Sequence, residues 1–379
     1  MNALMEAETP CLLLDAVRMD RNIARLQARM DAFGVMLRPH MKTAKSLDVA
    51  ARVMAGAGAA ITVSTLKEAE AFAAAGVRDM LYAVTIAPGK LGRAAALCAQ
   101  TGGGLMLVVD SVAAAEAVAA HARESGTAQR ALIEIDVDGK RAGVKAGDAA
   151  ALLAVGRALQ EGGAALAGVM SHSGGSYAGG GPDAMAAAAE TERAGAVLSA
   201  RILREAGLPA PIVSVGSTPT AHFARDLAGV SEVRAGVYMF FDLVMAGLGV
   251  CGLEDIAISV LATVIGHQHG TGDAIIDAGW TALSRDRGTA GQAVDQGYGL
   301  VCDVAGRPFG DLIVREVNQE HGILALREGS GGRAPRLPIG TQVRVLPNHA
   351  CATAAQHGAY AVMGAGGRIE AEWPRFGGW

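Results

Sequence analysis

The chain has 379 residues, of which 51% are apolar and 18% are charged, and it carries a net charge of −4. This length suits one large domain with a second module, and the apolar content is sufficient to bury a core. A slightly acidic chain without a basic stripe excludes the phosphate-neutralising surface of a nucleic-acid-binding protein.

The cysteines and the apolar runs indicate where the protein works. The five cysteines are odd in number and widely scattered, which does not resemble a disulfide framework: Cys11, Cys98, Cys251, Cys302 and Cys351. No apolar run approaches the roughly 20 residues that span a bilayer. We therefore expect a cytoplasmic protein that has no membrane partner.

The first two-thirds of the chain repeat one unit, in which a short apolar run is followed by a turn and an Ala-rich amphipathic helix. Eight such runs predict parallel strands at 35–41, 59–64, 80–85, 105–110, 131–137, 166–172, 211–216 and 231–236. The stretches between them predict helices, among them 16–32, 66–75, 111–124 and 184–205, with Ser111 as a helix cap. Eight β/α units over this length are typical of a TIM-type (β/α)8 barrel.

A doubly wound open sheet would show the same alternation. The glycine-rich dinucleotide fingerprint is missing after the first strand, where the chain reads Arg-Pro-His-Met-Lys-Thr over 38–43. After about Leu248 strand-like runs replace the alternation, at 256–267, 273–278, 300–304, 311–314, 322–326, 341–346 and 359–362. We expect a barrel over residues 11–247 and an antiparallel β-rich, metal-binding domain over 248–379 together with residues 1–10.

Three basic side chains alternate at the end of the first barrel strand. Arg38, His40 and Lys42 should share one face, and barrel enzymes carry their catalytic groups at such strand ends. A lysine in this position is a candidate amine nucleophile. The alternative is that Lys42 and Lys45 only begin a solvated helix.

A phosphate site is predicted after the last two barrel strands. The seventh strand ends in Gly216-Ser217-Thr218 and the eighth in Gly236-Val237-Tyr238. Loops at these two places commonly bind phosphate in barrels through backbone N–H groups and small hydroxyls. Two ordinary glycine turns are the alternative interpretation.

Further polar residues follow the fifth and sixth strands. Glu134 and Asp136 share a face, Arg141 follows them, and His172 precedes a glycine-rich loop that leads to Tyr177. We interpret Arg141, His172 and Tyr177 as pocket residues, although a barrel interior can also hold a purely structural polar layer.

A histidine and a cysteine stand two residues apart in the β-rich region. On a strand edge, His349 and Cys351 would face the same way, as two ligands of one metal must. Imidazole with thiolate favours Zn²⁺ over Mg²⁺ or Ca²⁺. A buried cysteine beside a turn histidine is the structural alternative.

These motifs together resemble the D-threonine aldolase/D-serine dehydratase family of fold type III, alanine-racemase-like enzymes, over essentially the whole chain. The stretches at 61–70, 240–245, 284–289 and 318–322 point to its 3-hydroxyaspartate dehydratase branch. The resemblance implies pyridoxal 5′-phosphate (PLP) held by Lys42, with its phosphate in the loops after the seventh and eighth strands, and a homodimer. From their places at the strand ends, we expect Arg38, His40, Arg141, His172 and Tyr177 in the same pocket. The resemblance also implies a divalent metal at His349 and Cys351, with Zn²⁺ preferred and Mn²⁺, Co²⁺ or Mg²⁺ as alternatives.

The activity implied by the resemblance is the metal-assisted dehydration of a D-3-hydroxyamino acid. D-threo-3-hydroxyaspartate would give oxaloacetate and ammonia; D-serine is the alternative substrate for this chemistry. The other alternative is an aldolase that cleaves a D-threonine-type substrate to glycine and an aldehyde. Aldolases of the family tend to have Asp at the position of Cys351, so the cysteine favours the dehydratase. The long β-rich region argues against a PLP carrier that consists of a barrel alone.

Overall fold

The computed structural model describes residues 7–178 and 180–379. The described chain forms two compact units. Residues 25–236 and 376–379 make up the first, which we call the barrel unit. Residues 7–24 and 237–375 make up the second, which we call the sheet unit. Each unit is described by itself below.

The barrel unit contains the eight predicted parallel strands, which confirms the TIM-type fold. They lie in the order β2 (Met36–Pro39), β10 (Glu232–Ala235), β9 (Ile212–Val215), β8 (Ala165–Ser171), β6 (Arg130–Asp136), β5 (Leu105–Val109), β4 (Asp79–Thr85) and β3 (Ala60–Val63). A single bridge between His40 and Thr62 joins the two ends of this series, so the barrel is nearly closed. The two-residue strand β7 (Val144–Lys145), which pairs with β6, was not predicted.

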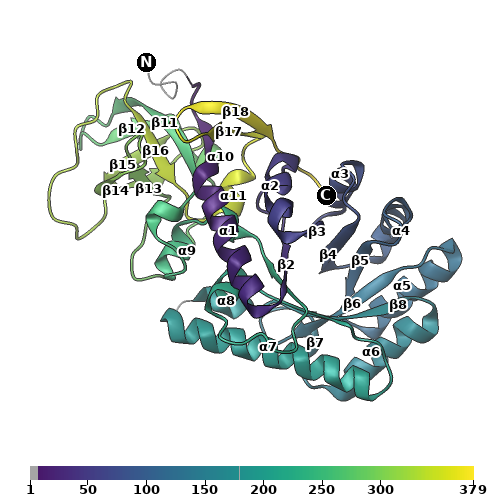
Figure 1. The fold of residues 1–379 in the computed structure, drawn as a ribbon. Helices are drawn as coiled ribbons and strands as arrows, with labels where there is room; N and C mark the ends of the chain where they lie inside the picture. The colour runs from purple at the N-terminus through teal and green to yellow at the C-terminus, as the bar shows by residue number, and fades with distance from the viewer. Residues whose placement is uncertain (1–6, 179) are drawn as a thin grey trace. The chain divides into compact units, whose positions relative to one another are not determined.

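Helices follow the strands as predicted. They are α2 (Leu47–Ala57), α3 (Leu66–Ala74), α4 (Leu91–Gln100), α5 (Val112–Ser125), α6 (Ala149–Gly162), α7 (Gly181–Glu205) and α8 (Thr218–Phe223). Figure 1 shows α3, α4 and α5 in sequence along the outside of the parallel strands. The predicted cap is confirmed, since the Ser111 side chain accepts a hydrogen bond from the backbone N–H of Ala114 and thereby satisfies a free helix-end donor.

Alternation along the strands explains the barrel core. Leu81, Met106, Val108, Leu132 and Met170 belong to one buried cluster, and each of the five is at most 2% exposed. Met106 and Val108 lie two residues apart on β5 and therefore face the same way. Full burial of one such side chain contributes about 1.5–3 kcal/mol to folding.

The sheet unit has one nine-stranded sheet. Its order is β12 (Ala274–Ile276), β15 (Gly322–Leu326), β14 (Pro308–Val317), β13 (Leu300–Cys302), β16 (Gln342–Leu346), β11 (Ile258–His267), β1 (Cys11–Asp15), β17 (Ala359–Met363) and β18 (Ile369–Pro374). Its pairings are antiparallel apart from β1 with β17. Short helices α9 (Leu243–Gly247), α10 (Trp280–Leu283) and α11 (Ala350–Ala354) connect strands.

The first strand of the chain belongs to this sheet. Residues 11–15 were expected in the barrel, but β1 pairs with β11 and β17. Leu12, Leu13 and Leu14 are at most 1% exposed, and Leu13 packs on Leu261 and Met363. A three-leucine run shows only that a segment is buried, and not which core buries it. The domain limits at 11–247 and 248–379 stay a prediction, since the compact units divide within α1 (Ala16–Phe33) and after Gly236.

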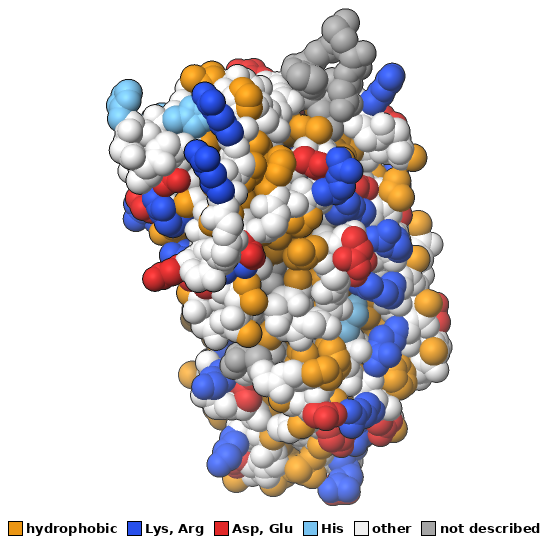
Figure 2. Space-filling view, turned by 90° about the vertical axis from the view of Figure 1, so that its left-hand side faces the viewer, with side chains coloured by type: hydrophobic (Ala, Val, Ile, Leu, Met, Phe, Trp, Pro, Cys, Tyr) orange, Lys and Arg blue, Asp and Glu red, His pale blue; other side chains and the backbone are white. Residues whose placement is uncertain are grey.

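The surface and the helices agree with a mixed-charge chain. On the face drawn in Figure 2, Lys and Arg side chains lie among Asp and Glu side chains. No helix within residues 7–178 or 180–379 combines the length and the apolarity needed to cross a membrane.

Candidate active site

The two lysines after β2 have different surroundings. The Nζ of Lys45 lies 3.3 Å from Oε1 of Glu68, whose side chain is 1% exposed. Lys42 is exposed, and its ammonium forms no ion pair or hydrogen bond among the described residues. It follows β2 in a turn rather than in a helix, so the interpretation as the start of a solvated helix fails for Lys42. Lys45 is occupied in the ion pair, and Lys42 is therefore the available amine.

Two histidines lie within the electrostatic reach of Lys42. Burial, together with the charges of Lys42, Arg141 and Arg234, lowers the pKa of His172 from 6.5 to about 3. Burial likewise lowers the pKa of His40 well below its usual value, with Lys42, Arg234 and His172 adding to the effect. Both imidazoles are therefore neutral near pH 7.

The tautomer of His172 follows from its hydrogen bond. Its Nδ1 lies 3.0 Å from the carbonyl oxygen of Gly216. A carbonyl only accepts, so Nδ1 carries the proton and Nε2 is left with a lone pair. The ring of Tyr177 stands 6.3 Å from the His172 ring at an interplanar angle of 36°. The structure thus brings Lys42, His172 and Tyr177 into one neighbourhood of the barrel unit.

The predicted phosphate loop after β9 is folded around a residue that the sequence did not single out. Oε1 of Glu192, on α7, accepts hydrogen bonds from the backbone N–H groups of Ser173, at 2.9 Å, and Gly216, at 3.0 Å. Oε2 accepts from the hydroxyl of Thr220 at 2.9 Å. The N–H of Gly216 is therefore already bonded within the protein.

The backbone at Gly216 leaves no room for a side chain. Its φ is +128°, and an added Cβ would lie 2.4 Å from the carbonyl oxygen of Arg234 on the neighbouring strand. The group available for an anion in this loop is instead the hydroxyl of Thr218. That residue is 1% exposed, and its Oγ1 has no hydrogen-bond partner among the described residues. A buried hydroxyl without a partner costs free energy, and a bound phosphate would satisfy it.

Ser217 and Gly236 line the same part of the barrel unit. The hydroxyl of Ser217 lies 3.0 Å from that of Ser176, in the loop after β8. A Cβ on Gly236 would lie 2.9 Å from the carbonyl oxygen of His40. Val237 and Tyr238 belong to the sheet unit, where both are buried. The hydroxyl of Tyr238 has no partner among the described residues, and burial raises its pKa.

Arg38 has a structural position. It is 2% exposed, and its guanidinium pairs with Glu232 at 2.8 Å and with Asp79 at 2.7 Å. These carboxylates begin β10 and β4, at the end of the barrel opposite to Lys42. The structure therefore does not bring Arg38 to the other predicted cofactor residues.

Arg234, on β10, lies beside Ser214 of β9 and within electrostatic reach of both histidines. This residue, which was not predicted, donates to the Ser214 hydroxyl and to the Ser171 carbonyl, and its charge reaches both His40 and His172.

Arg141 is exposed after β6, and its Nε would lie 3.4 Å from a Cβ built on Gly174 in the next loop. Its charge acts on His172 and on Glu134. Glu134 accepts from the Thr85 hydroxyl at 3.0 Å, and burial raises its pKa. Arg141 thus joins the neighbourhood of Lys42 and His172, whereas the carboxylate of Asp136 binds backbone N–H groups of its own turn.

In the sheet unit, the prediction that His349 and Cys351 lie on a strand edge is wrong. The strand β16 ends at Leu346, His349 is the N-cap of α11, and Cys351 is inside that helix. Pro347 has no N–H with which to continue the ladder, and alanines favour the helix that follows. The two side chains nevertheless interact, since Cys351 is a hydrogen-bond partner of His349.

Two carboxylates complete this site. Nδ1 of His349 lies 3.0 Å from Oδ2 of Asp286. The hydrogen bonds with Asp286 and Cys351, together with the charges of Cys351 and Asp242, raise the pKa of His349 to about 11 against the effect of burial. Asp242, 1% exposed, accepts from the N–H groups of Met245 and Ala350, both at 2.9 Å, and burial raises its pKa to about 6.

The backbone before each carboxylate is unusual. Phe241 has a φ of +50° and Ser284 a φ of +74°, and Lys45 is the other non-glycine residue with positive φ in the described chain. Such conformations cost about 1–3 kcal/mol each and persist where their surroundings enforce them. They identify the segments of Asp242 and Asp286, which the sequence analysis used only for the family resemblance.

The donors at His349 fit a divalent metal. A metal-bound histidine almost always donates its other ring N–H to a carboxylate, as His349 does to Asp286, which leaves Nε2 for the ion. The thiol of Cys351 adds a soft ligand. Within the residues that the structure describes, no three His, Cys, Asp or Glu side chains are grouped to hold a metal by themselves. His349 and Cys351 are therefore two candidate ligands, and a metal held by them would have further positions for water or substrate.

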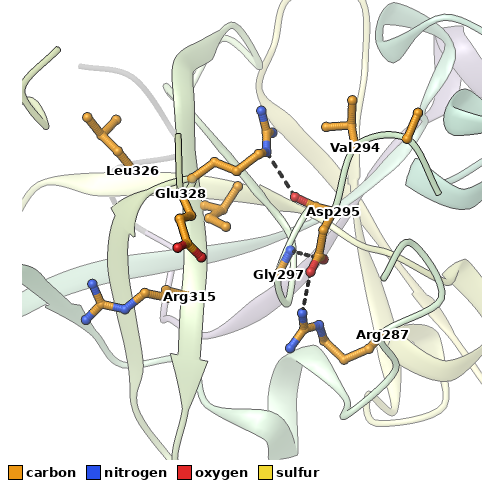
Figure 3. A pocket seen from close by; sticks show the side chains of 10 residues that line it. Arg287, Val294, Asp295, Gly297, Arg315, Leu326 and Glu328 are labelled. Atoms are coloured by element: carbon orange, nitrogen blue, oxygen red, sulfur yellow. Dashed lines mark hydrogen bonds and ion pairs between the residues drawn. The ribbon is translucent and has the colours of Figure 1, made fainter. Parts of the chain in front are cut away.

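A pocket of about 820 Å³ also lies in the sheet unit (Figure 3). Three arginines line it, but each is paired: Arg287 with Asp295 at 2.7 Å, Arg315 with Asp273 at 3.1 Å, and Arg327 with Asp311. Figure 3 shows Asp295 also held by the N–H of Gly297. These ion pairs leave no unpaired arginine for an anionic ligand, so we do not assign the catalytic site to this pocket.

Two family models match successive parts of the chain. Residues 14–244 match the alanine racemase N-terminal domain, and residues 257–363 match a putative serine dehydratase domain. The chain is 57% identical to a D-threo-3-hydroxyaspartate dehydratase of Delftia sp. (strain HT23), with 100% of both chains covered. It is 30% identical to a D-serine dehydratase of Dictyostelium discoideum, covering 94% of this chain and 93% of that one.

A solved structure gives the same result. The dehydratase from Delftia sp. HT23 superimposes with a TM-score of 0.97 at 56% identity, covering 100% of both chains. A cysteine-to-alanine variant of a D-threo-3-hydroxyaspartate dehydratase, with the same TM-score and identity, is described as being in the metal-free form. The chain belongs to the D-threonine aldolase/D-serine dehydratase family, whose members are PLP-dependent lyases with an alanine-racemase-like fold.

Proposed function

We propose that this protein is a PLP- and divalent-metal-dependent dehydratase that converts D-threo-3-hydroxyaspartate into oxaloacetate and ammonia. The observation that carries the proposal is the pair of His349 and Cys351 with Asp286 behind the histidine, in a chain that also presents an unpaired Lys42. The Delftia enzyme, identical at 57% of positions, is named for this reaction.

Lys42 is the residue proposed to hold PLP, and Ser217 with Thr218 the residues proposed to hold its phosphate. Support comes from the unpaired amine of Lys42 and from the buried, unpartnered hydroxyl of Thr218. Gly236, Val237 and the buried hydroxyl of Tyr238 stay candidates for the same role. PLP, when bound, supplies an electron sink for the negative charge left at Cα.

The chain's own groups then divide the remaining tasks. Nζ of Lys42 is proposed to accept the Cα proton, because it is the amine in this neighbourhood that no carboxylate holds. His40 and His172 stay neutral, and His172 presents Nε2 as an acceptor. Because both histidines are neutral and carry no negative charge, they do not form ion pairs with Arg141 and Arg234, and these cations stay available to anions.

The side-chain carboxylate of 3-hydroxyaspartate needs a cationic or hydroxyl partner. Arg141 and Tyr177 are the preferred candidates, because both lie beside His172. The guanidinium of Arg285 stacks over the Trp280 ring, 4.7 Å from its centroid, and so is less available. We expect Arg141→Ala to raise KM for 3-hydroxyaspartate more than KM for D-serine, which lacks the second carboxylate.

The metal is proposed to bind Nε2 of His349 and Sγ of Cys351, and Zn²⁺ is preferred because imidazole and thiolate are borderline-soft ligands. Mn²⁺, Co²⁺ and Mg²⁺ are the alternatives. A divalent metal, when bound, supplies Lewis acidity toward a substrate hydroxyl. Asp286 holds Nδ1 of His349 and thereby orients the ring.

The alternatives are a D-serine dehydratase and an aldolase. A D-threonine aldolase of Arthrobacter sp. is 27% identical over 95% of this chain and 90% of that one. One experiment separates the three: incubate the PLP- and Zn²⁺-loaded protein with D-threo-3-hydroxyaspartate, D-serine and D-threonine and identify the products. We expect oxaloacetate and ammonia from the first at the highest kcat/KM. Glycine with an aldehyde as the main products would contradict the dehydratase.

A matched variant sharpens this test. Cys351→Asp replaces the soft ligand by the residue that aldolases of the family tend to have. We expect the ratio of glycine to oxo acid to rise in this variant, since a harder ligand set retains a harder metal. An unchanged ratio in a metal-loaded Cys351→Asp protein would mean that the cysteine does not determine the reaction.

The assembly and location are also proposals. A homodimer follows from the family, and light scattering on the purified protein tests it. A cytoplasmic location is supported by the five cysteines, none of which forms a disulfide in the structure.

A further inference from the structure

A buried carboxylate joins two loops of the barrel unit. Glu192, in the middle of α7, is 1% exposed, and its Oε1 accepts from the backbone N–H groups of both Ser173 and Gly216. The first N–H belongs to the loop after β8 and the second to the end of β9. The other oxygen, Oε2, accepts from the Thr220 hydroxyl at 2.9 Å, in α8.

These contacts belong to one hydrogen-bond network with His172. Ser173 is the next residue in the chain, and Gly216 is the residue whose carbonyl accepts the Nδ1 proton of His172 at 3.0 Å. Glu192 therefore binds the N–H of Gly216, while His172 binds the carbonyl oxygen of the same residue. Any shift of the Gly216 backbone would change the acceptor that sets the tautomer of His172.

We propose that Glu192 is a positioning residue, which holds the loops after β8 and β9 together and so keeps Nδ1 of His172 protonated and Nε2 free to accept. The consequence for the cofactor rests on the proposed PLP site. The consequence for His172 does not rest on that site, because every atom of the hydrogen-bond network belongs to the protein.

The chemistry of the three partners explains the choice of residue. Two are backbone N–H groups, which can only donate, and the hydroxyl of Thr220 donates as well, so three donors meet at this side chain. A carboxylate of this length accepts from all three, while the Thr220 hydroxyl could also accept from an amide. Burial raises the pKa of Glu192, and the hydrogen bonds from Gly216, Thr220 and Ser173 oppose that effect.

Two substitutions separate position from charge. Glu192→Gln keeps the length: its oxygen can accept from both N–H groups, and its amide can donate to Oγ1 of Thr220. Glu192→Asp keeps the charge but is one methylene shorter, so it cannot reach both loops. The matched controls are Glu190→Gln and Glu190→Asp, because Glu190 lies on the same helix with its side chain 53% exposed, paired with Arg193.

The first readout is the ¹⁵N spectrum of the histidine rings in the full-length protein without PLP, with His172 identified by its loss in His172→Gln. We expect Glu192→Gln to retain the Nδ1-protonated ring and Glu192→Asp to give a mixture of tautomers. The second readout is the dissociation constant for PLP. It should rise about ten-fold in Glu192→Asp, as for the loss of one or two hydrogen bonds, and less than three-fold in Glu192→Gln.

The outcomes are distinguishable. A wild-type tautomer and PLP affinity in a folded Glu192→Asp protein would overturn the proposal, and so would equal damage in Glu192→Gln, which would indicate a role for the charge. Should Glu192→Asp fail to melt cooperatively, Glu192→Gln decides alone, since it must keep both signals. If wild-type protein binds no PLP, the proposed function fails while the tautomer still tests Glu192.

Discussion

The two histidine sites of this protein have opposite electrostatics. In the barrel unit, burial and the positive charges of Lys42, Arg141 and Arg234 lower the pKa of His172 to about 3. In the sheet unit, Asp286, Cys351 and Asp242 raise the pKa of His349 to about 11. The first environment favours anions, such as a phosphate or a carboxylate. The second favours cations, because a metal ion meets the same acceptors as the proton that it replaces.

The two sites also differ in how the chain builds them. The barrel site is formed where successive parallel strands end, so its residues occur at a repeating place in the sequence. The proposed metal site draws Asp242, Asp286 and His349 from segments that are far apart in the sequence and have no common pattern. If the two sites are as independent as this contrast suggests, a change at one should leave the other intact.

The largest effect should come from Lys42→Ala. It removes the amine proposed to hold PLP, so the visible absorbance of the lysine-bound cofactor and turnover should both be lost, turnover by on the order of 10⁴-fold or more. Absorbance spectra and steady-state kinetics measure this.

The matched control is Lys45→Ala. Because it breaks an ion pair with buried Glu68, it should lower the melting temperature while it retains absorbance and turnover. Borohydride reduction that labelled Lys45 instead of Lys42 would contradict the assignment.

The metal site should fail without disturbing the cofactor. His349→Ala, or treatment with a chelator, should stop dehydration and leave the PLP absorbance intact, and added Zn²⁺ should restore only the chelated wild type. Asp286→Asn should weaken metal affinity by about 10–100-fold, as expected for the loss of the carboxylate that orients a metal-bound histidine.

Asp295→Asn is the control, since the carboxylate of Asp295 pairs with Arg287 rather than with His349. Full dehydratase activity in a verified metal-free preparation would remove the metal from the mechanism.

An intermediate effect is expected from Gly216→Val. The new side chain would meet the Arg234 carbonyl and force an unfavourable φ, a strain of about 1–3 kcal/mol. We expect PLP affinity to fall about 10-fold, while metal affinity at His349 is unchanged. Gly89→Val is the control, because nothing lies within 4 Å of an added Cβ there. Unchanged PLP affinity in folded Gly216→Val would mean that this loop is not part of the cofactor site.

The smallest effect concerns pH. The folded pKa of His172, about 3, is below the unfolded value of 6.5, so the unfolded chain binds the proton first as the pH falls. Above pH 6.5 the ring is neutral in both states, so burial of His172 does not lower the stability of the folded protein. As the pH falls from 6.5 to about 3, the unfolded chain gains the proton and the free energy of unfolding decreases. His172→Gln should make the free energy of unfolding less dependent on pH in this window, by at most about 1.4 kcal/mol per pH unit. Denaturant titrations at several pH values measure it, and identical slopes would show that His172 is not buried as a neutral ring.

Much of the fold could be predicted, because local patterns determine it. Continuous apolar runs bounded by turns indicate buried parallel strands wherever they occur, and all eight were confirmed. The placement of β1 could not be predicted in the same way. The run Leu12–Leu14 has the same pattern as a barrel strand, and only its pairing with β11 and β17 assigns it to the sheet unit.

In the candidate site too, some residues could be predicted from the sequence and others only from the tertiary structure. The sequence by itself singled out Lys42, the β9 loop and the pair of His349 and Cys351 as candidates, because their residue types and spacing are chemical signals that do not depend on distant partners. Tertiary structure decided that Lys45 is occupied by Glu68, that His349 caps a helix, and that Asp286 and Glu192 hold the two histidine sites in position. A buried carboxylate acquires its role from the donors packed against it, and at Glu192 two of those three are backbone N–H groups, which every residue except proline carries.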